Sequence, residues 1–144
     1  MSIIKINIKK KYKAKHFYPK KKKILTWLKS IFKKKVELNI VMIKKSEMKK
    51  LNFKYKDKNY PTNILTFAYK KTHCLKNNFI GEIIICNQII YEESLQKKKT
   101  LLSYWASIII HGALHLLYNN NSKNLKIKKL EKKIMYKLGY KNFY

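Results

Sequence analysis

His111 and His115 are the residues of this chain best suited to chemistry, because they stand four positions apart in His111-Gly112-Ala113-Leu114-His115. In a helix, residues i and i+4 project from the same side, so two imidazoles at this spacing can converge on one metal ion. A histidine in an apolar helix can instead be a core residue with a hydrogen-bonded ring. The spacing alone leaves both interpretations open.

The residue that follows the first histidine separates this segment from the zinc peptidases. Their HExxH motif places a glutamate directly after the first histidine, where it serves as general base. Here that position is Gly112, so the usual proton acceptor is missing. The segment therefore argues against a metallopeptidase.

The apolar pattern predicts the elements that must hold this pair. Spacings of three and four predict helices, and alternation or short continuous apolar runs predict strands. Ser46 is expected to cap a short helix over residues 47–53, and Gly81 to open a strand. Mixed helices and strands in one domain indicate an α+β or α/β fold, with the order of the strands left open. Helices are predicted at about 24–32, 88–98, 101–118 and 125–138, and strands at about 4–8, 36–43, 63–68 and 81–86.

Length and charge limit the class of protein. The 144 residues suffice for one domain, expected to span 1–144, and 46% of them are hydrophobic. The formal net charge is +28, and all 35 basic residues are lysines. The absence of arginine favours an A/T-rich genome as the main origin of the excess, because a protein selected to grip nucleic acid normally includes arginine. Such a surface still attracts polyanions.

The sequence also predicts where the protein works. Residues 1–15 contain no apolar stretch of signal-peptide length, and no window is expected to span a membrane. Cys74 and Cys86 do not form a CxxC pair and are interpreted as reduced thiols. We expect a cytoplasmic protein without a membrane partner.

Four segments follow one another between about Glu37 and Tyr144: Asn52-x-x-Tyr55-Lys56, Tyr60-Pro61-Thr62-Asn63-Ile64-Leu65-Thr66-Phe67, Gly81-Glu82-Ile83-Ile84-Ile85-Cys86 and His111-Gly112-x-Leu114-His115-Leu116-Leu117. Together they resemble the YbeY family of metal-dependent endoribonucleases. The family pattern runs roughly N-x-x-[YF]-R, P-T-[DN]-V-L-[ST]-F, G-[DE]-I-x-I and H-G-x-L-H-L-x-G-[YF]-D-H. Four motifs in the right order and at sensible spacing are difficult to obtain by chance.

The resemblance implies a fold and an activity. The fold is a single α+β domain with a mixed sheet flanked by helices, and the two-histidine helix is packed at the sheet. The activity is single-strand-specific cleavage of RNA in 16S rRNA 3′-end processing and ribosome quality control. One zinc ion, held by three histidines, would leave a fourth position for water. The implied partners are the 16S rRNA precursor and the small ribosomal subunit, with no DNA expected.

The third zinc ligand departs from the family pattern. The position six residues after His115 is Asn121, or Asn120 if one residue is deleted before Tyr118. An amide oxygen is a poor ligand for zinc, which favours imidazole or thiolate. We therefore expect the metal site to be His111, His115 and Asn121, with weakened zinc binding. His73, Cys74 and Glu82 are weaker candidates for a replacement ligand.

The second departure is Lys56, which stands where the family carries an arginine thought to contact the scissile phosphate. Lysine keeps the charge and loses the bidentate fork. Lys56 is the expected catalytic residue. Three functions follow: a metal-dependent endoribonuclease; a degenerate, non-catalytic RNA- or ribosome-binding member of the family; and, against the argument from Gly112, a metallopeptidase.

Overall fold

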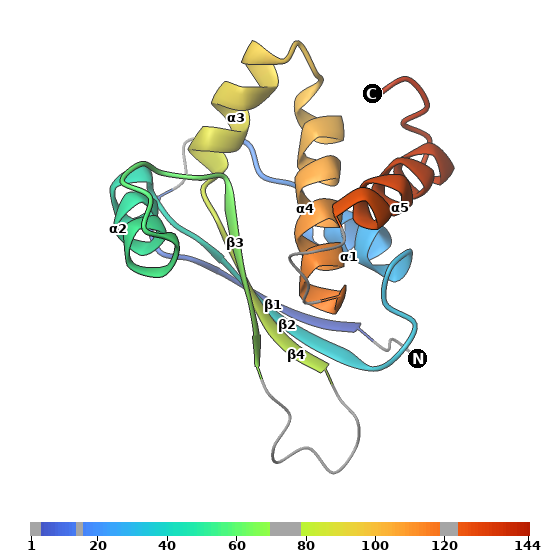
Figure 1. The fold of residues 1–144 in the computed structure, drawn as a ribbon, viewed down its shortest axis with the longest axis horizontal. Coiled ribbons are helices and arrows are strands. Elements are labelled where there is room, and N and C mark those ends of the chain that lie inside the picture. Colours follow the sequence, from blue (N-terminus) through green and yellow to red (C-terminus); the bar gives the residue numbers. More distant parts are fainter. Residues whose placement is uncertain (1–3, 14–15, 70–78, 119–123) are drawn as a thin grey trace.

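The computed structural model describes residues 4–13, 16–69, 79–118 and 124–144. Strands and helices are mixed along this part of the chain, and the helices gather towards its C-terminal half (Figure 1). The elements, in order, are β1 (Ile4–Lys10), α1 (Lys21–Lys29), β2 (Val36–Met42), α2 (Lys45–Lys56), β3 (Ile64–Tyr69), β4 (Phe79–Ile85), α3 (Asn87–Gln96), α4 (Leu101–Tyr118) and α5 (Asn124–Lys137).

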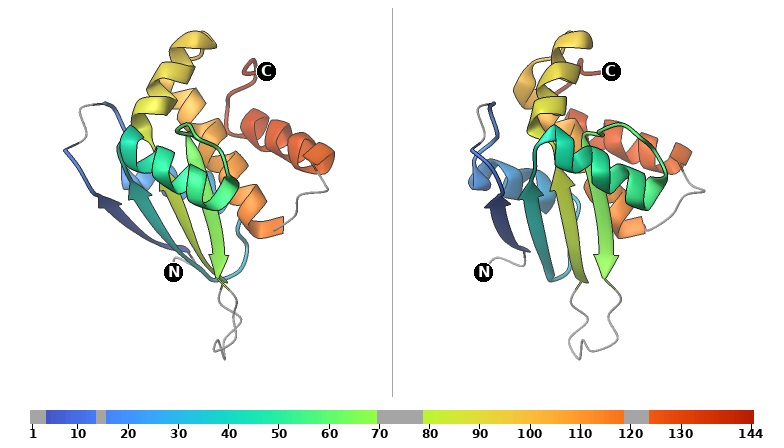
Figure 2. Two further views of the ribbon diagram at one scale, coloured as in Figure 1. Left: turned by 60° about the vertical axis from the view of Figure 1, so that its left-hand side comes forward. Right: turned by 90° about the vertical axis from the view of Figure 1, so that its left-hand side faces the viewer.

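The strands form one mixed sheet in the order β1-β2-β4-β3. Strands β1, β2 and β4 are parallel, and β3 runs antiparallel to β4 at one edge (Figure 2). Ile40 at the centre of β2 stands between Ile8 of β1 and Ile83 of β4. Helices lie on both faces of the sheet. The single-domain α+β fold with a mixed sheet flanked by helices is thus confirmed.

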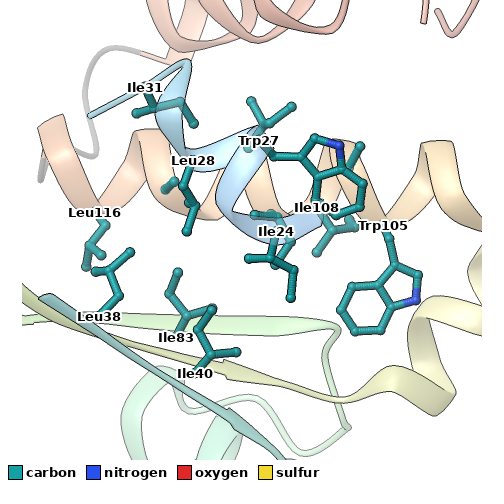
Figure 3. Packing of buried hydrophobic residues seen from close by; sticks show 14 of the residues in the cluster. Ile24, Trp27, Leu28, Ile31, Leu38, Ile40, Ile83, Trp105, Ile108 and Leu116 are labelled. Atoms are coloured by element: carbon teal, nitrogen blue, oxygen red, sulfur yellow. The ribbon is translucent and has the colours of Figure 1, made fainter. Parts of the chain in front are cut away.

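The main core lies between the sheet and helices α1 and α4. Alternate residues of β2 and β4 point to this side, because successive side chains of a strand face opposite ways. Leu38, Ile40 and Ile83 from the sheet meet Ile24 and Leu28 of α1 (Figure 3). The spacing of three and four that predicted this helix is therefore the spacing of its buried face.

Helix α4 is the centre of this core. It packs against α1, α3, α5 and β3, and twelve of its eighteen residues are buried. By length and composition alone it is apolar enough to cross a membrane, which corrects the expectation that no segment reaches that threshold. Its apolar surface is instead covered by protein on nearly every side. A helix that is hydrophobic all round is typical of such a central position.

The opposite face of the sheet carries a smaller core beneath α2, which crosses that face (Figure 2). Ser46 does not cap α2: the helix begins at Lys45, and Lys44 occupies the N-cap position without a side-chain hydrogen bond. The Cys86 thiol is free and buried, and burial is the main factor that raises its pKa. This smaller core beneath α2 consists of Ile43, Met48, Leu65, Ile84 and Cys86.

Gly81 lies within β4, two residues after the start of the strand, and pairs with Leu38 of β2. A Cβ atom built at Gly81 would lie 2.7 Å from Cδ2 of Leu116 and 3.2 Å from both its Cδ1 and Cγ. Leu116 is almost fully buried, so the whole side chain would have to move. The glycine therefore lets the end of α4, next to His115, approach the sheet.

Gly81→Ala is expected to lower the free energy of unfolding by about 1–3 kcal/mol, the usual cost of an overpacked core. Chemical denaturation monitored by circular dichroism measures this loss. In a Leu116→Ala background the same substitution should cost clearly less, because the atoms it collides with are gone. Equal losses in the two backgrounds would contradict the steric explanation.

Candidate active site

A cleft of about 440 Å³ opens where the end of α2, residues 58–62, β3 and α4 meet. Both histidines line it, together with Gly112 between them. Lys56, the last residue of α2, and Lys58 also line it. The remaining lining residues are mainly polar or small: Asn52, Tyr60, Thr62, Ile64, Leu65 and Thr66.

The rings of His111 and His115 lie side by side, with centroids 4.3 Å apart and an angle of 56° between their planes. Their convergence on one cleft is the arrangement expected from the i, i+4 spacing. Burial lowers the pKa of His115, the nearby His111 and Lys56 lower it further, and Glu131 opposes them. His115 is therefore held in the neutral form that binds metals. Its role as a ligand stays a prediction.

Gly112 brings the histidine-bearing turn of α4 close to β3. A Cβ atom at this position would lie 2.6 Å from Cδ1 of Ile64 and 3.3 Å from Cγ2 of Thr66. Without a side chain between the two histidines, β3 can form the floor of the cleft directly beneath them. Where the zinc peptidases place their glutamate, this chain has a packing contact. The described lining of the cleft contains no carboxylate, which further weakens the peptidase alternative.

Glu131 of α5 supports His111 from behind. The distance from His111 Nδ1 to Glu131 Oε1 is 3.3 Å, and the glutamate side chain is only 12% exposed. A neutral His111 whose Nδ1–H donates to this carboxylate keeps the lone pair of Nε2 for a metal. Sequence reasoning assigned no role to Glu131. The available signal was a single acidic residue in the lysine-rich helix α5.

Tyr144 holds Glu131 in turn. The pKa of the Tyr144 hydroxyl is raised, first by burial and then by the charge of Glu131 and its hydrogen bond to that carboxylate. The hydroxyl therefore stays protonated and donates. Tyr144, Glu131 and His111 form a chain of contacts that ends at the cleft.

The donor set matches part of a catalytic zinc site. Two imidazoles from one helix supply two of the three protein ligands such a site usually has. Across residues 4–13, 16–69, 79–118 and 124–144, no three His, Cys, Asp or Glu side chains are grouped to hold a metal. The predicted third ligand, Asn121 or Asn120, and the weaker candidates His73 and Cys74 lie outside the described residues.

Glu82 is not brought to the histidines. Neighbouring Gly81 faces α4, so Glu82 points to the other face of the sheet. There it lines a separate hollow with Asn39 of β2 and Glu47 of α2. The weak prediction that Glu82 contributes a metal-binding oxygen to the site is therefore wrong.

Comparison with known proteins identifies the family of this chain. Residues 4–139 match the family model described as Endoribonuclease YbeY. The chain belongs to the YbeY family. The endoribonuclease YbeY of Buchnera aphidicola subsp. Baizongia pistaciae is 44% identical over 148 aligned residues, covering 98% of this chain and 96% of that protein. The endoribonuclease YbeY of Buchnera aphidicola subsp. Acyrthosiphon pisum is 42% identical over 147, covering 98% and 95%.

The fold has a counterpart among solved structures. The solution structure of TM1509 from Thermotoga maritima aligns with a TM-score of 0.52 and 22% sequence identity, covering 92% of this chain and 90% of that chain. At this identity the likeness shows the fold alone. The single α+β domain therefore agrees with both the sequence motifs and the neighbouring structure.

The motif Asn52-x-x-Tyr55-Lys56 lies at the end of α2 and helps to form the cleft. Asn52 is buried, and its Nδ2 donates to the Tyr60 carbonyl at 2.8 Å, which fixes residues 58–62 against the helix. Asp57 ends α2 in the left-handed conformation and turns the chain towards the cleft. Lys56 and Lys58 then stand on either side of this turn and both line the cleft. The sequence motif pointed to Lys56 and gave no signal for Lys58.

Proposed function

We propose that this protein is a single-strand-specific, zinc-dependent endoribonuclease that acts in the cytoplasm on the 3′ end of 16S rRNA precursors and in ribosome quality control. Membership of the YbeY family supports endoribonuclease activity. The observation that carries the proposal is the convergence of His111 and His115 in a cleft that also contains Lys56. The 16S rRNA precursor and the small ribosomal subunit are the proposed partners.

The histidines of the cleft would bind the metal ion, and its lysines would bind the phosphate of the RNA. His111 would hold zinc through Nε2, and His115 through one of its ring nitrogens. Asn121 is the proposed third ligand. A zinc ion, when bound, polarises the phosphoryl oxygen and lowers the pKa of a bound water. Lys56 and Lys58 attract the RNA backbone and place positive charge beside the scissile phosphate. The hydroxyls of Thr62 and Thr66 line the cleft and are available to ribose or phosphate oxygens.

A specific observation favours a second candidate. The amide at position 121 or 120 replaces an imidazole in the family pattern, which weakens zinc binding. The same lysine-lined cleft would then bind RNA or the ribosome without cutting. This is the degenerate, non-catalytic alternative.

Cleavage of matched substrates distinguishes the two. We expect the purified protein with zinc to cut a single-stranded RNA that carries a 16S rRNA 3′ end, and to spare both the duplex and the single-stranded DNA of the same sequence. Addition of a chelator should stop the reaction. Gel analysis of end-labelled substrates measures each rate. RNA binding without cleavage at saturating zinc would support the non-catalytic alternative.

Restoring an imidazole tests the third ligand. Asn121→His is expected to tighten zinc binding at least tenfold, about 1.4 kcal/mol. If this chain lacks one residue of the family pattern before Tyr118, the same result is expected of Asn120→His. The reason is that two converging imidazoles already stand in the cleft. Isothermal titration of zinc measures the change, and the cleavage rate should rise with it. Gln96→His, an exposed position at the end of α3, is the control and should leave zinc affinity unchanged. If neither asparagine variant improves on wild type, this ligand assignment is wrong.

A further inference from the structure

A second hollow of about 510 Å³ lies directly beside the cleft and shares Thr62, Ile64 and His111 with it. Its outer wall is formed by Lys97 and Lys99, which follow α3, and by Phe143 and Tyr144, which follow α5. The shared His111 means that an extended chain leaving the cleft past this histidine enters the second hollow.

We propose that this hollow is a subsite for one nucleotide that flanks the scissile phosphate of single-stranded RNA. The base stacks on Tyr144, and the adjoining phosphate is held by Lys97 and Lys99. The inference rests on the proposed function and deepens it, because it names a binding position outside the metal cleft.

The ring of Tyr144 is suited to stacking because it is both exposed and fixed. The residue is 57% exposed, and its hydroxyl is tied to Glu131 by a hydrogen bond. The Phe143 ring meets it edge-on, with centroids 5.0 Å apart and an interplanar angle of 80°. An aromatic face held in place, next to lysines, is the usual platform for a base of a single strand.

The two lysines are positioned by aromatic rings of the same hollow. Nζ of Lys99 lies 4.6 Å from the centroid of the Phe143 ring and also donates a hydrogen bond to the Phe143 carbonyl. Nζ of Lys97 lies 5.5 Å from the centroid of the Tyr104 ring. An ammonium group has three N–H donors, so Lys99 keeps others for a phosphate oxygen.

Three polar residues that line the hollow already have partners: Asn63 and Tyr104 both donate to Glu93 behind them, and Glu131 contacts His111 and Tyr144. Oε1 of Glu93 accepts hydrogen bonds from Asn63 Nδ2 at 2.8 Å and from the Tyr104 hydroxyl at 2.9 Å. Burial, followed by the charge and hydrogen bond of Glu93, raises the pKa of Tyr104, so its hydroxyl remains a donor to the carboxylate. Groups occupied in this way form a fixed wall of the hollow.

The test uses binding of a fluorescently labelled oligouridylate to the full chain, measured by anisotropy without added zinc. Tyr144→Ala is expected to weaken binding about tenfold, the effect of losing one base–aromatic stack. Tyr144→Phe keeps the ring and should bind like wild type. Tyr136→Ala is the matched control, because Tyr136 is 57% exposed like Tyr144 and lines neither the cleft nor the hollow. Each ring also has a lysine Nζ 5.5 Å from its centroid, Lys132 at Tyr144 and Lys141 at Tyr136.

An oligouridylate that lacks one base locates the stack. With a single abasic residue moved along a short oligouridylate, the wild type should lose about tenfold in affinity at one position, and Tyr144→Ala should lose nothing further there. The subsite would be overturned if Tyr144→Ala and Tyr136→Ala lost RNA affinity equally, or if neither variant lost any. It would also be overturned if Tyr144→Phe lost as much RNA affinity as Tyr144→Ala. The hydroxyl and its bond to Glu131, and not the ring, would then be responsible for binding. A wild type that neither binds nor cuts RNA would instead overturn the proposed function.

Discussion

His115→Ala is expected to lower zinc-dependent RNA cleavage by more than about a hundredfold and to leave the fold intact. The variant removes one of the two imidazoles that converge in the cleft, 4.3 Å from its partner by ring centroids. Loss of a group that only orients a metal ligand typically costs 10–100-fold, so loss of the ligand itself should cost more. Single-turnover cleavage and zinc titration measure the two effects, and circular dichroism checks the fold.

His16→Ala is the matched control for this prediction. His16 is partly buried like His115, its ring contacts Tyr91 with centroids 4.9 Å apart, and it does not line the cleft. Its substitution should leave both cleavage and zinc affinity within about twofold of wild type, because His16 lies outside the cleft. Wild-type cleavage by His115→Ala would remove the histidine pair from the mechanism altogether.

Glu131→Gln is expected to weaken zinc binding and cleavage by about 10–100-fold, the range found when the carboxylate behind a metal-binding histidine is lost. The substitution keeps the size of the side chain and removes the negative charge 3.3 Å from His111 Nδ1. The preference for the proton on Nδ1 should therefore fall. Nitrogen-15 NMR of the histidine side chains measures this tautomer directly, without any metal.

Glu92, whose side chain is 45% exposed, supplies the control for Glu131. It forms a surface ion pair with Lys45 at 2.6 Å, and such pairs contribute little. Glu92→Gln should leave the His111 tautomer, zinc affinity and cleavage unchanged. If Glu131→Gln alters cleavage but not the tautomer, Glu131 acts by some route other than orienting His111.

The parts of the site that a single helix determines could be predicted from the sequence. His111 and His115 needed only the helical repeat to be placed together, and the surrounding apolar residues predicted that their helix is buried. Glu131 could not be found in this way, because its contact with His111 depends on how α5 crosses α4. Lys58 was missed for a similar reason: its place in the cleft depends on the turn at Asp57 and the Asn52–Tyr60 hydrogen bond.

The fold shows the same division between local and long-range information. The sequence predicted the strands and helices but left the strand order open, because pairing joins segments far apart in the chain. Gly81 was expected to open β4 and lies inside it, since register with β2 extends the strand back to Phe79. A glycine looks like a boundary in the sequence; here its missing side chain makes room for Leu116.

The burial of α4 ties the chemistry of this enzyme to its global stability. Helices at the centre of a core exchange their amide hydrogens only when the whole domain opens. Because α4 carries both histidines and is enclosed by α1, α3, α5 and β3, the pair has no low-energy way to separate while the protein stays folded. Substrate must therefore adapt to a rigid pair of imidazoles, and any adjustment of the cleft on binding falls to the exposed side chains of Lys56, Lys58 and Tyr60.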